Sequence, residues 1–200
     1  MQFTKPSFLE TKIEDKFFVL KSKNDKDKNK LLKKEIDLNY IQFHFVIDGN
    51  ATFSFNNGAY KMDVSKGKYI VLYNPKKNLP VDALIHAKSY VLSVLISIKK
   101  FHKLFSEDSN NIQFLKDQNV NQKYYHENKI SNKIFLVLNE LKRFDSGSST
   151  KNLFIKAKIY ELFSHLYNRN LDQNVEQCPF LNNEENFKKI QKAKHLVISN

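Results

Sequence analysis

A single histidine, His44, stands among phenylalanines in the stretch IQFHFVIDGNATFSF at residues 41–55. A histidine on a strand of a small β-barrel can bind a metal, but a metal site needs several ligands that converge on one point. Two histidines one residue apart on a strand would project into one cavity, whereas this stretch has only one. We therefore predict no metal site, and we expect His44 to be packed in the core or to touch a small-molecule ligand.

No catalytic motif accompanies this histidine. The chain has six scattered histidines, no HExxH motif, and four glycines that form neither a GxGxxG nor a Walker loop. The single cysteine, Cys178 in EQCPF, excludes an internal disulfide and a zinc site built on paired cysteines, and we expect it in a connecting loop. We therefore predict no catalytic residues and no cofactor. Absence of a motif does not exclude an enzyme, but it removes any positive case for one.

The net charge of +12 does not by itself predict binding to nucleic acid. The excess is spread along the chain, and exposed charges are screened beyond about 8 Å at physiological salt. Only two of the 33 basic residues are arginines, Arg143 and Arg169, although reading of base edges depends strongly on arginine. The lysine-rich run at residues 21–34 is expected to be a solvated loop, with a phosphate-binding arm as the alternative.

A series of alternating strand patterns separated by turns follows this run. Asx-Gly pairs between alternating segments are a strong hairpin signal, because these residues tolerate the positive φ of tight turns. The alternation places Phe43 and Phe45 on one face and Gln42 and His44 on the other. The pattern predicts an antiparallel β-barrel or sandwich, with strands at residues 40–47, 51–55, 59–64, 69–75, 81–86 and 89–97.

From residue 98 the hydrophobic period changes to that of a helix. A short helix is expected at 98–105, and Ser131 is expected to cap a second helix through 144. The third helix, at 151–168, is apolar on two sides: Ile155, Ile159, Leu162, Phe163 and Leu166 on one, and Leu153, Ala157, Tyr160 and Tyr167 on the other. One side can cover the β-domain, and the other needs a partner from the same chain, a second chain or both. We expect a homodimer.

Nothing in the chain predicts a membrane span. The longest apolar stretch, at residues 90–97, is far shorter than the roughly 18 to 20 residues that a bilayer requires. No secretory signal is visible at the N-terminus either, so we expect a cytoplasmic protein.

The stretch YIQFHFVIDGNATFSFNNGAYKMDVSKGKYIVLYNP resembles the N-terminal cupin-like domain of AraC-family transcriptional regulators. SVLISIKKFHKLF, the two helices that follow, EQCPF and IQKAKHLVISN are similar to Bacteroidetes-type members that are related to pyochelin-receptor regulators. The resemblance implies an α+β fold, with a cupin-like antiparallel β-barrel or sandwich followed by an α-helical dimerisation segment. In the family, the helix that IQKAKHLVISN resembles opens a DNA-binding unit, and this chain ends before either recognition helix.

The resemblance implies a cupin-like ligand-binding β-domain at residues 1–97, a helical dimerisation region at 98–170, a linker at 171–182, and the first helix of a truncated helix-turn-helix domain at 183–200. It implies a small-molecule effector in a pocket lined by Gln42, Phe43, His44, Phe45, Phe53, Phe55 and Tyr73. It implies dimer contacts through Leu138, Leu141, Leu153, Ala157, Tyr160 and Tyr167. DNA would be bound only through a C-terminal domain that is absent from this chain.

The predicted function is the sensing and dimerisation region of such a regulator, and the resemblance implies the regulatory branch that is not enzymatic. One alternative is a stand-alone cupin-like protein that binds a small molecule or acts as an enzyme. Another is a free-standing partner that dimerises with complete regulators and inactivates them because it lacks a DNA-reading unit.

Overall fold

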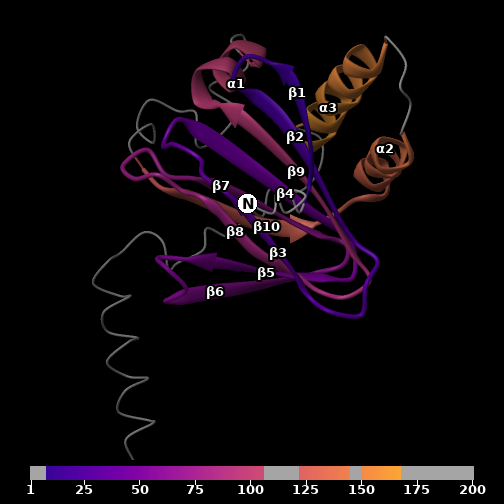
Figure 1. The fold of residues 1–200 in the computed structure, drawn as a ribbon. Helices are drawn as coiled ribbons and strands as arrows, with labels where there is room; N and C mark the ends of the chain where they lie inside the picture. The colour runs from indigo at the N-terminus through magenta and orange to yellow at the C-terminus, as the bar shows by residue number, and fades with distance from the viewer. Residues whose placement is uncertain (1–7, 106–121, 145–149, 168–200) are drawn as a thin grey trace, which may run out of the picture.

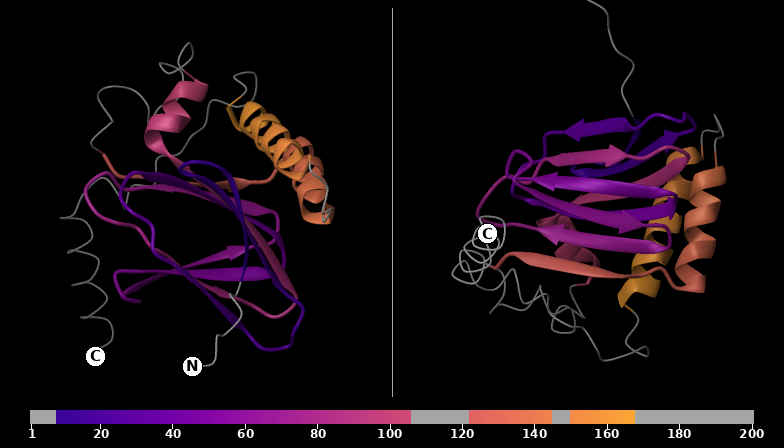
Figure 2. Two further views of the ribbon diagram at one scale, coloured as in Figure 1. Left: turned by 45° about the horizontal axis from the view of Figure 1, so that its top comes forward. Right: turned by 90° about the horizontal axis from the view of Figure 1, so that it is seen from below.

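Two antiparallel β-sheets lie face to face, and helices cover the outer side of the larger one (Figures 1 and 2). The computed structural model describes residues 8–105, 122–144 and 150–167. The larger sheet has the order β1 (Leu9–Glu14), β2 (Phe17–Asn24), β9 (Ser89–Ser97), β4 (Tyr40–Asp48), β7 (Lys68–Tyr73) and β10 (Tyr124–Lys129). The smaller sheet has the order β3 (Lys30–Lys34), β8 (Val81–Ile85), β5 (Asn50–Phe55) and β6 (Tyr60–Ser65). The helices are α1 (Ile98–Leu104), α2 (Asn132–Arg143) and α3 (Lys151–Tyr167).

The pairing of the strands is that of a jelly roll. In sequence order, β2 pairs with β9, β3 with β8, β4 with β7 and β5 with β6, as in a long hairpin that has been rolled into two sheets. The roll is completed where β9 pairs with β4 and β8 pairs with β5. Cupins belong to the proteins built in this way. The predicted cupin-like sandwich is therefore confirmed, and the alternative of a closed barrel is wrong, because the strands form two separate sheets.

The elements predicted between residues 40 and 167 are largely confirmed. All six strand patterns from residue 40 to residue 97 form strands, with boundaries that shift by one or two residues. The three helices begin and end close to their predicted positions, and the Ser131 hydroxyl accepts a hydrogen bond from the Ile134 amide at the start of α2. The predicted linker at 171–182 and last helix at 183–200, with Cys178, lie outside the described residues.

Two segments differ from the prediction because polar side chains hid their strand pattern. The expected loop at residues 21–34 contains the end of β2 and all of β3, and Asn24 is buried there. The Asn24 side-chain amide donates hydrogen bonds to the Ile85 and His86 carbonyls, at 3.1 and 2.8 Å, which ties β2 to the turn after β8. The polar stretch at 124–129, inside the region expected to be helical, forms β10 and pairs with β7.

The two faces of the larger sheet belong to two different hydrophobic cores. One core lies between the sheets and includes Leu20, Phe53 and Ile85. The other lies between the larger sheet and the helices, where Phe163 of α3 packs its ring 5.1 Å from that of Phe43. Both faces of β4 are therefore buried, as in a strand at the centre of a three-layer structure.

Ion pairs connect the helices to β1 and to each other. Glu14 of β1 forms ion pairs with Lys100 of α1 and Lys156 of α3, and the two lysines hold the pKa of its carboxyl below the usual range. Lys158 of α3 lies 2.5 Å from Glu140 of α2.

Among the helices of the described residues, none has the length and the apolar character that a membrane span requires.

The turn between β4 and β5 provides a test of the fold. Gly49 has a φ of +65°, and a Cβ atom there would lie 2.0 Å from the Ser89 Oγ. Gly67 has a φ of +78° but nothing within 4 Å of the same position. We expect Gly49→Ala to lower the free energy of unfolding by about 2 to 5 kcal/mol, because strain and overpacking add, and Gly67→Ala by about 1 to 2 kcal/mol. Urea denaturation of both variants measures the difference, and equal losses would contradict the close approach at Gly49.

Candidate functional site

The residues predicted to line one pocket lie on opposite sides of the larger sheet. Phe43, Phe45 and Tyr73 belong to the core under the helices. Gln42, His44, Phe53 and Phe55 lie toward the space between the two sheets. These seven side chains cannot line one cavity, because neighbouring residues on a strand point to opposite faces. Only one of the two groups could therefore line a single cavity, and the prediction left open which face of β4 that would be.

His44 is held in a linear chain of hydrogen bonds between the sheets. Its Nδ1 lies 2.8 Å from the Ser93 Oγ, and its Nε2 lies 3.1 Å from the Gln42 Oε1. The Gln42 Nε2 donates in turn to the Leu79 carbonyl at 2.5 Å. Since the Gln42 Oε1 can only accept, Nε2 of the neutral ring carries the hydrogen and Nδ1 accepts from the serine.

The environment of His44 strongly favours the neutral ring. The side chain has no exposed surface, and burial lowers its pKa from 6.5 to about 3. Both ring nitrogens are occupied by hydrogen bonds within the chain. Among the described residues, no group of three or more His, Cys, Asp or Glu side chains is placed to hold a metal ion. His44 is thus a packed core residue, the first of the two roles expected for it.

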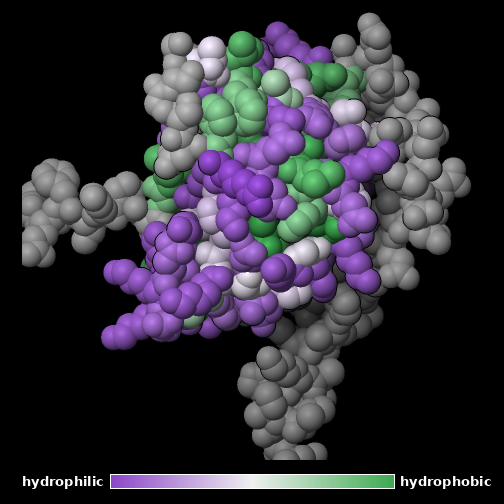
Figure 3. All heavy atoms as spheres, turned by 90° about the vertical axis from the view of Figure 1, so that its right-hand side faces the viewer, coloured by the Kyte–Doolittle hydropathy of each residue, from purple (hydrophilic) through white to green (hydrophobic). Residues whose placement is uncertain are grey.

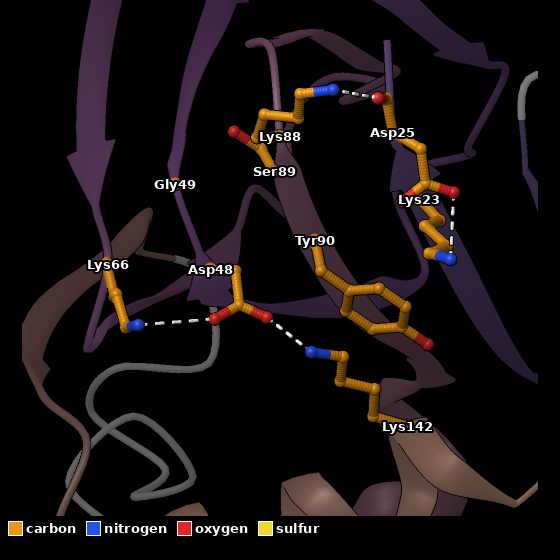
Figure 4. Close-up of a pocket in the computed structure, with 9 residues that line it drawn as sticks. All are labelled: Lys23, Asp25, Asp48, Gly49, Lys66, Lys88, Ser89, Tyr90 and Lys142. Atoms are coloured by element: carbon orange, nitrogen blue, oxygen red, sulfur yellow. Dashed lines mark hydrogen bonds and ion pairs between the residues drawn. The ribbon is translucent and has the colours of Figure 1, made fainter.

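A concave site lies at one end of the sandwich, where several turns meet the last turn of α2 (Figure 4). We call it the lysine pocket, because four of its lining side chains are lysines and only two are acidic. Its volume is about 300 Å³, at the lower end of the range for small-molecule sites. The lining residues are Lys23, Asp25, Asp48, Gly49, Lys66, Lys88, Ser89, Tyr90 and Lys142.

Asp48, at the end of β4, connects two of the pocket lysines. One of its carboxylate oxygens pairs with Lys142 of α2, and the other lies 3.3 Å from the Lys66 Nζ. The hydrogen bond from Lys142, followed by that from Lys66, lowers the pKa of Asp48. The Lys142 Nζ also lies 5.2 Å from the centre of the Tyr90 ring, so the aromatic face helps to hold this cation.

The other two lysines lie on the opposite side of the pocket. Lys23 is 2.8 Å from the Asp25 carboxylate. Lys88 donates to the Asp25 carbonyl at 2.6 Å and lies 3.1 Å from Asp27. These contacts are largely exposed, so they hold the two lysines only weakly.

The backbone between the two lysine pairs is fixed by Ser89. Its hydroxyl accepts a hydrogen bond from the Asn50 amide at 2.9 Å and donates one to the Ala87 carbonyl at 3.1 Å. The adjacent Gly49 allows the two turns to approach each other closely. Ser89 therefore has a structural role at the base of the lysine pocket.

The sequence analysis missed the lysine pocket because it forms only after the chain is rolled up. Lys66 lies in the turn between β6 and β7, and Lys88 in the turn between β8 and β9. In a jelly roll these turns lie at the same end as the end of β2, which carries Lys23. Lysine in the turns is not a sufficient signal, because Lys76 and Lys77 also lie in the intervening turn between β7 and β8.

The residues predicted to form a dimer contact separate into two groups. Leu138 and Leu141 of α2 are fully buried in the core of their own chain, so they have no surface for a second chain, and Tyr167 is partly buried. Leu153, Ala157 and Tyr160 of α3 are exposed on the helix side of the molecule, and the Tyr160 ring also stacks on that of Phe17 in β2, at 6.5 Å. Figure 3 shows hydrophobic side chains among hydrophilic ones on this side of the molecule.

The hydrogen-bonded chain around His44 gives a testable pH dependence. Between pH 6.5 and about 3 the unfolded chain binds a proton at this histidine and the folded chain does not, so its contribution makes the fold less stable as the pH falls. We expect the ring proton resonances of His44 to stay unchanged between pH 7 and pH 5. A midpoint near 6.5 in a nuclear magnetic resonance titration would show a solvated ring and contradict the arrangement.

Comparisons with known proteins give matches to solved structures only. No model of a known protein family matches the sequence, and no curated protein does. An apo ToxT variant from Vibrio cholerae strain SCE256 matches with a TM-score of 0.49 and 14% identity, over 82% of this chain and 60% of that one. Wild-type ToxT of the same strain, bound to an unsaturated fatty acid, matches with a TM-score of 0.41 and 16% identity, over 96% of this chain and 65% of that one.

A cupin protein from Bacteroides fragilis matches with a TM-score of 0.34 and 9% identity, over 49% of this chain and 82% of that one. The chain thus spans less than two thirds of the length of the two ToxT chains. Because all three TM-scores are below 0.5, the basis for the jelly-roll assignment is the strand pairing itself.

Proposed function

We propose that this chain is the ligand-sensing and dimerisation region of an AraC-type transcriptional regulator. The observation that carries the proposal is the helix pair, α2 and α3. The pair packs on the jelly roll with one side and keeps large apolar side chains exposed on the other. The resemblance in sequence implies this combination of a cupin-like domain and a helical segment that joins two chains. The proposal includes a cytoplasmic location.

The outer side of the helix pair is the proposed dimer surface. Leu153 of α3 is 68% exposed and Leu136 of α2 is 64% exposed, and the helices also expose Phe135 and Tyr160 by 38% and 37%. Exposed leucines of this size on neighbouring helices favour association. A second copy of the chain would cover them symmetrically, with the same surface on each partner.

A contact between the lysine pocket and the helix pair supports the sensing role. Lys142, in the last turn of α2, reaches Asp48 at the end of β4 and thereby joins the helix pair to the pocket. A ligand that changes this contact can favour one position of α2 over another, which is the differential interaction that a ligand-dependent switch requires. The attached DNA-binding units would then respond to the position of the helices.

We propose that this role does not include catalysis. The buried histidine that could have served in a cupin-like enzyme has both ring nitrogens in hydrogen bonds. The described pocket offers lysines and carboxylates that are paired with each other rather than a nucleophile beside a base. These contacts suit binding more than bond making.

The dimer surface is tested by a charge on either helix. We expect the purified chain to be a dimer, and Leu153→Glu or Leu136→Glu to weaken dimerisation at least about tenfold, because the interface would bury an unpaired carboxylate. Sedimentation velocity over a range of concentrations measures the dimer fraction.

The matched control is Leu31→Glu, since Leu31 is also an exposed leucine but lies on β3, in the smaller sheet. This variant should dimerise like the unmodified chain. A monomeric unmodified chain at high concentration, or equal weakening by all three substitutions, would count against the proposed surface.

A further inference from the structure

We propose that the lysine pocket binds a small anion with two or more negative charges, carried by carboxylate or phosphate groups. The site would use Lys23 and Lys88 on one side and Lys66 and Lys142 on the other (Figure 4). The inference deepens the proposed function by naming the chemical class of the effector. It rests on that function only for the response of the helix pair.

The lining of the pocket carries an excess of positive charge. Its four lysines come from β2, two separate turns and α2, and only three carboxylates, those of Asp25, Asp27 and Asp48, pair with them. Like charges gathered in a concave site reinforce one another and raise the local concentration of anions. An anion with several charges would reduce this repulsion, because it can contact lysines from both sides.

Asp48 lies between two of the pocket lysines. Its two carboxylate oxygens contact the Lys66 and Lys142 ammonium groups, so a carboxylate already occupies the position that a ligand anion would take. Asp48 thus shows that this pair of lysines can hold one carboxylate between them. Since Asp48 belongs to the protein, it also competes with a ligand, and the pocket is expected to prefer an anion with more charge than one carboxylate.

The size and shape of the pocket suit a small ligand. A volume of about 300 Å³ admits a small metabolite but not a helix or a nucleic-acid duplex. The base is rigid, since Ser89 fixes the two turns by hydrogen bonds on both sides of its hydroxyl. The lysines that approach from the rim are exposed and can adjust to the ligand.

Binding would act on α2 through Lys142. When the ligand takes this ammonium group, the ion pair to Asp48 is replaced by a contact to the ligand, and the link between β4 and the last turn of α2 changes. The contact of Lys142 with the Tyr90 ring keeps the lysine in the pocket during this exchange. The effector class and the route to the helix pair thus follow from the same four lysines.

The test is isothermal titration calorimetry on the complete chain, with citrate and inorganic phosphate as probes at constant ionic strength. We expect saturable binding of one of the two anions, and its identity distinguishes a carboxylate from a phosphate effector. Lys23→Gln and Lys88→Gln should each weaken binding about tenfold, because each removes one charged contact. The control is Lys33→Gln on β3, outside the pocket, since the Lys33 and Lys23 side chains are both 63% exposed. It should bind like the unmodified chain.

Asp48→Asn gives the opposite expectation. Removal of the competing carboxylate frees Lys66 and Lys142, so the affinity for the anion should rise several-fold. Circular dichroism checks that the variant keeps its fold. The proposal is overturned if citrate and phosphate both fail to show saturable binding, to the unmodified chain and to Asp48→Asn alike. It is also overturned if Lys33→Gln weakens binding as much as Lys23→Gln. A monomeric chain that still binds the anion would contradict the proposed dimer and leave this site intact.

Discussion

The register of β4 is the constraint on which the structure depends, because both faces of this strand are buried. Phe43 and Phe45 fill the core under the helices, while His44 lies between the sheets. A slip of one residue would exchange the two sets. It would place a histidine under the helices and separate it from the Ser93 hydroxyl, and an unpaired buried polar group costs about 1 to 3 kcal/mol. The hydrogen-bonded chain around His44 therefore specifies the register that positions both layers.

The attachment of the helix layer combines strong and weak interactions. The strong part is the aromatic core in which Phe43, Phe101 and Phe163 pack their rings together. The weak part is the set of ion pairs at the rim, because partly exposed pairs contribute only about 0 to 1 kcal/mol each. The contact between Lys142 and Asp48 belongs to this second class, since both side chains are 32% exposed. Its exchange for a ligand contact would cost little, and the aromatic core would keep α2 and α3 on the sheet.

The sequence was sufficient for the elements whose periodicity is visible in single residues. β4, β5 and β6 alternate, β7 and β9 are short apolar runs, and all of them lie between turn residues, while Ser131 marks the start of α2. β3 and the end of β2 were not predicted, because lysines occupy strand positions there. Lys21 is an example: its long aliphatic stem lies along the sheet, and its ammonium group donates to the Phe144 carbonyl at 2.9 Å. The pocket could not be predicted, because alternation does not show which face of β4 points into the sandwich and because the lysine pocket needs turns far apart in sequence.

The packing between the sheets explains why the candidate site lies at the end of the sandwich. Sheets that pack face to face are about 10 Å apart, and side chains from both inner faces fill this space. Leu20, Phe53 and Ile85 are essentially unexposed there, so a ligand between the sheets would have to displace side chains that hold the jelly roll together. At the end of the sandwich the turns present charged groups that are already partly hydrated, and an anion can replace water and weak ion pairs. Lys142 of α2 also contacts Asp48 at this end of the sandwich. The site that a ligand can enter without displacing core side chains is therefore also connected to the helix pair.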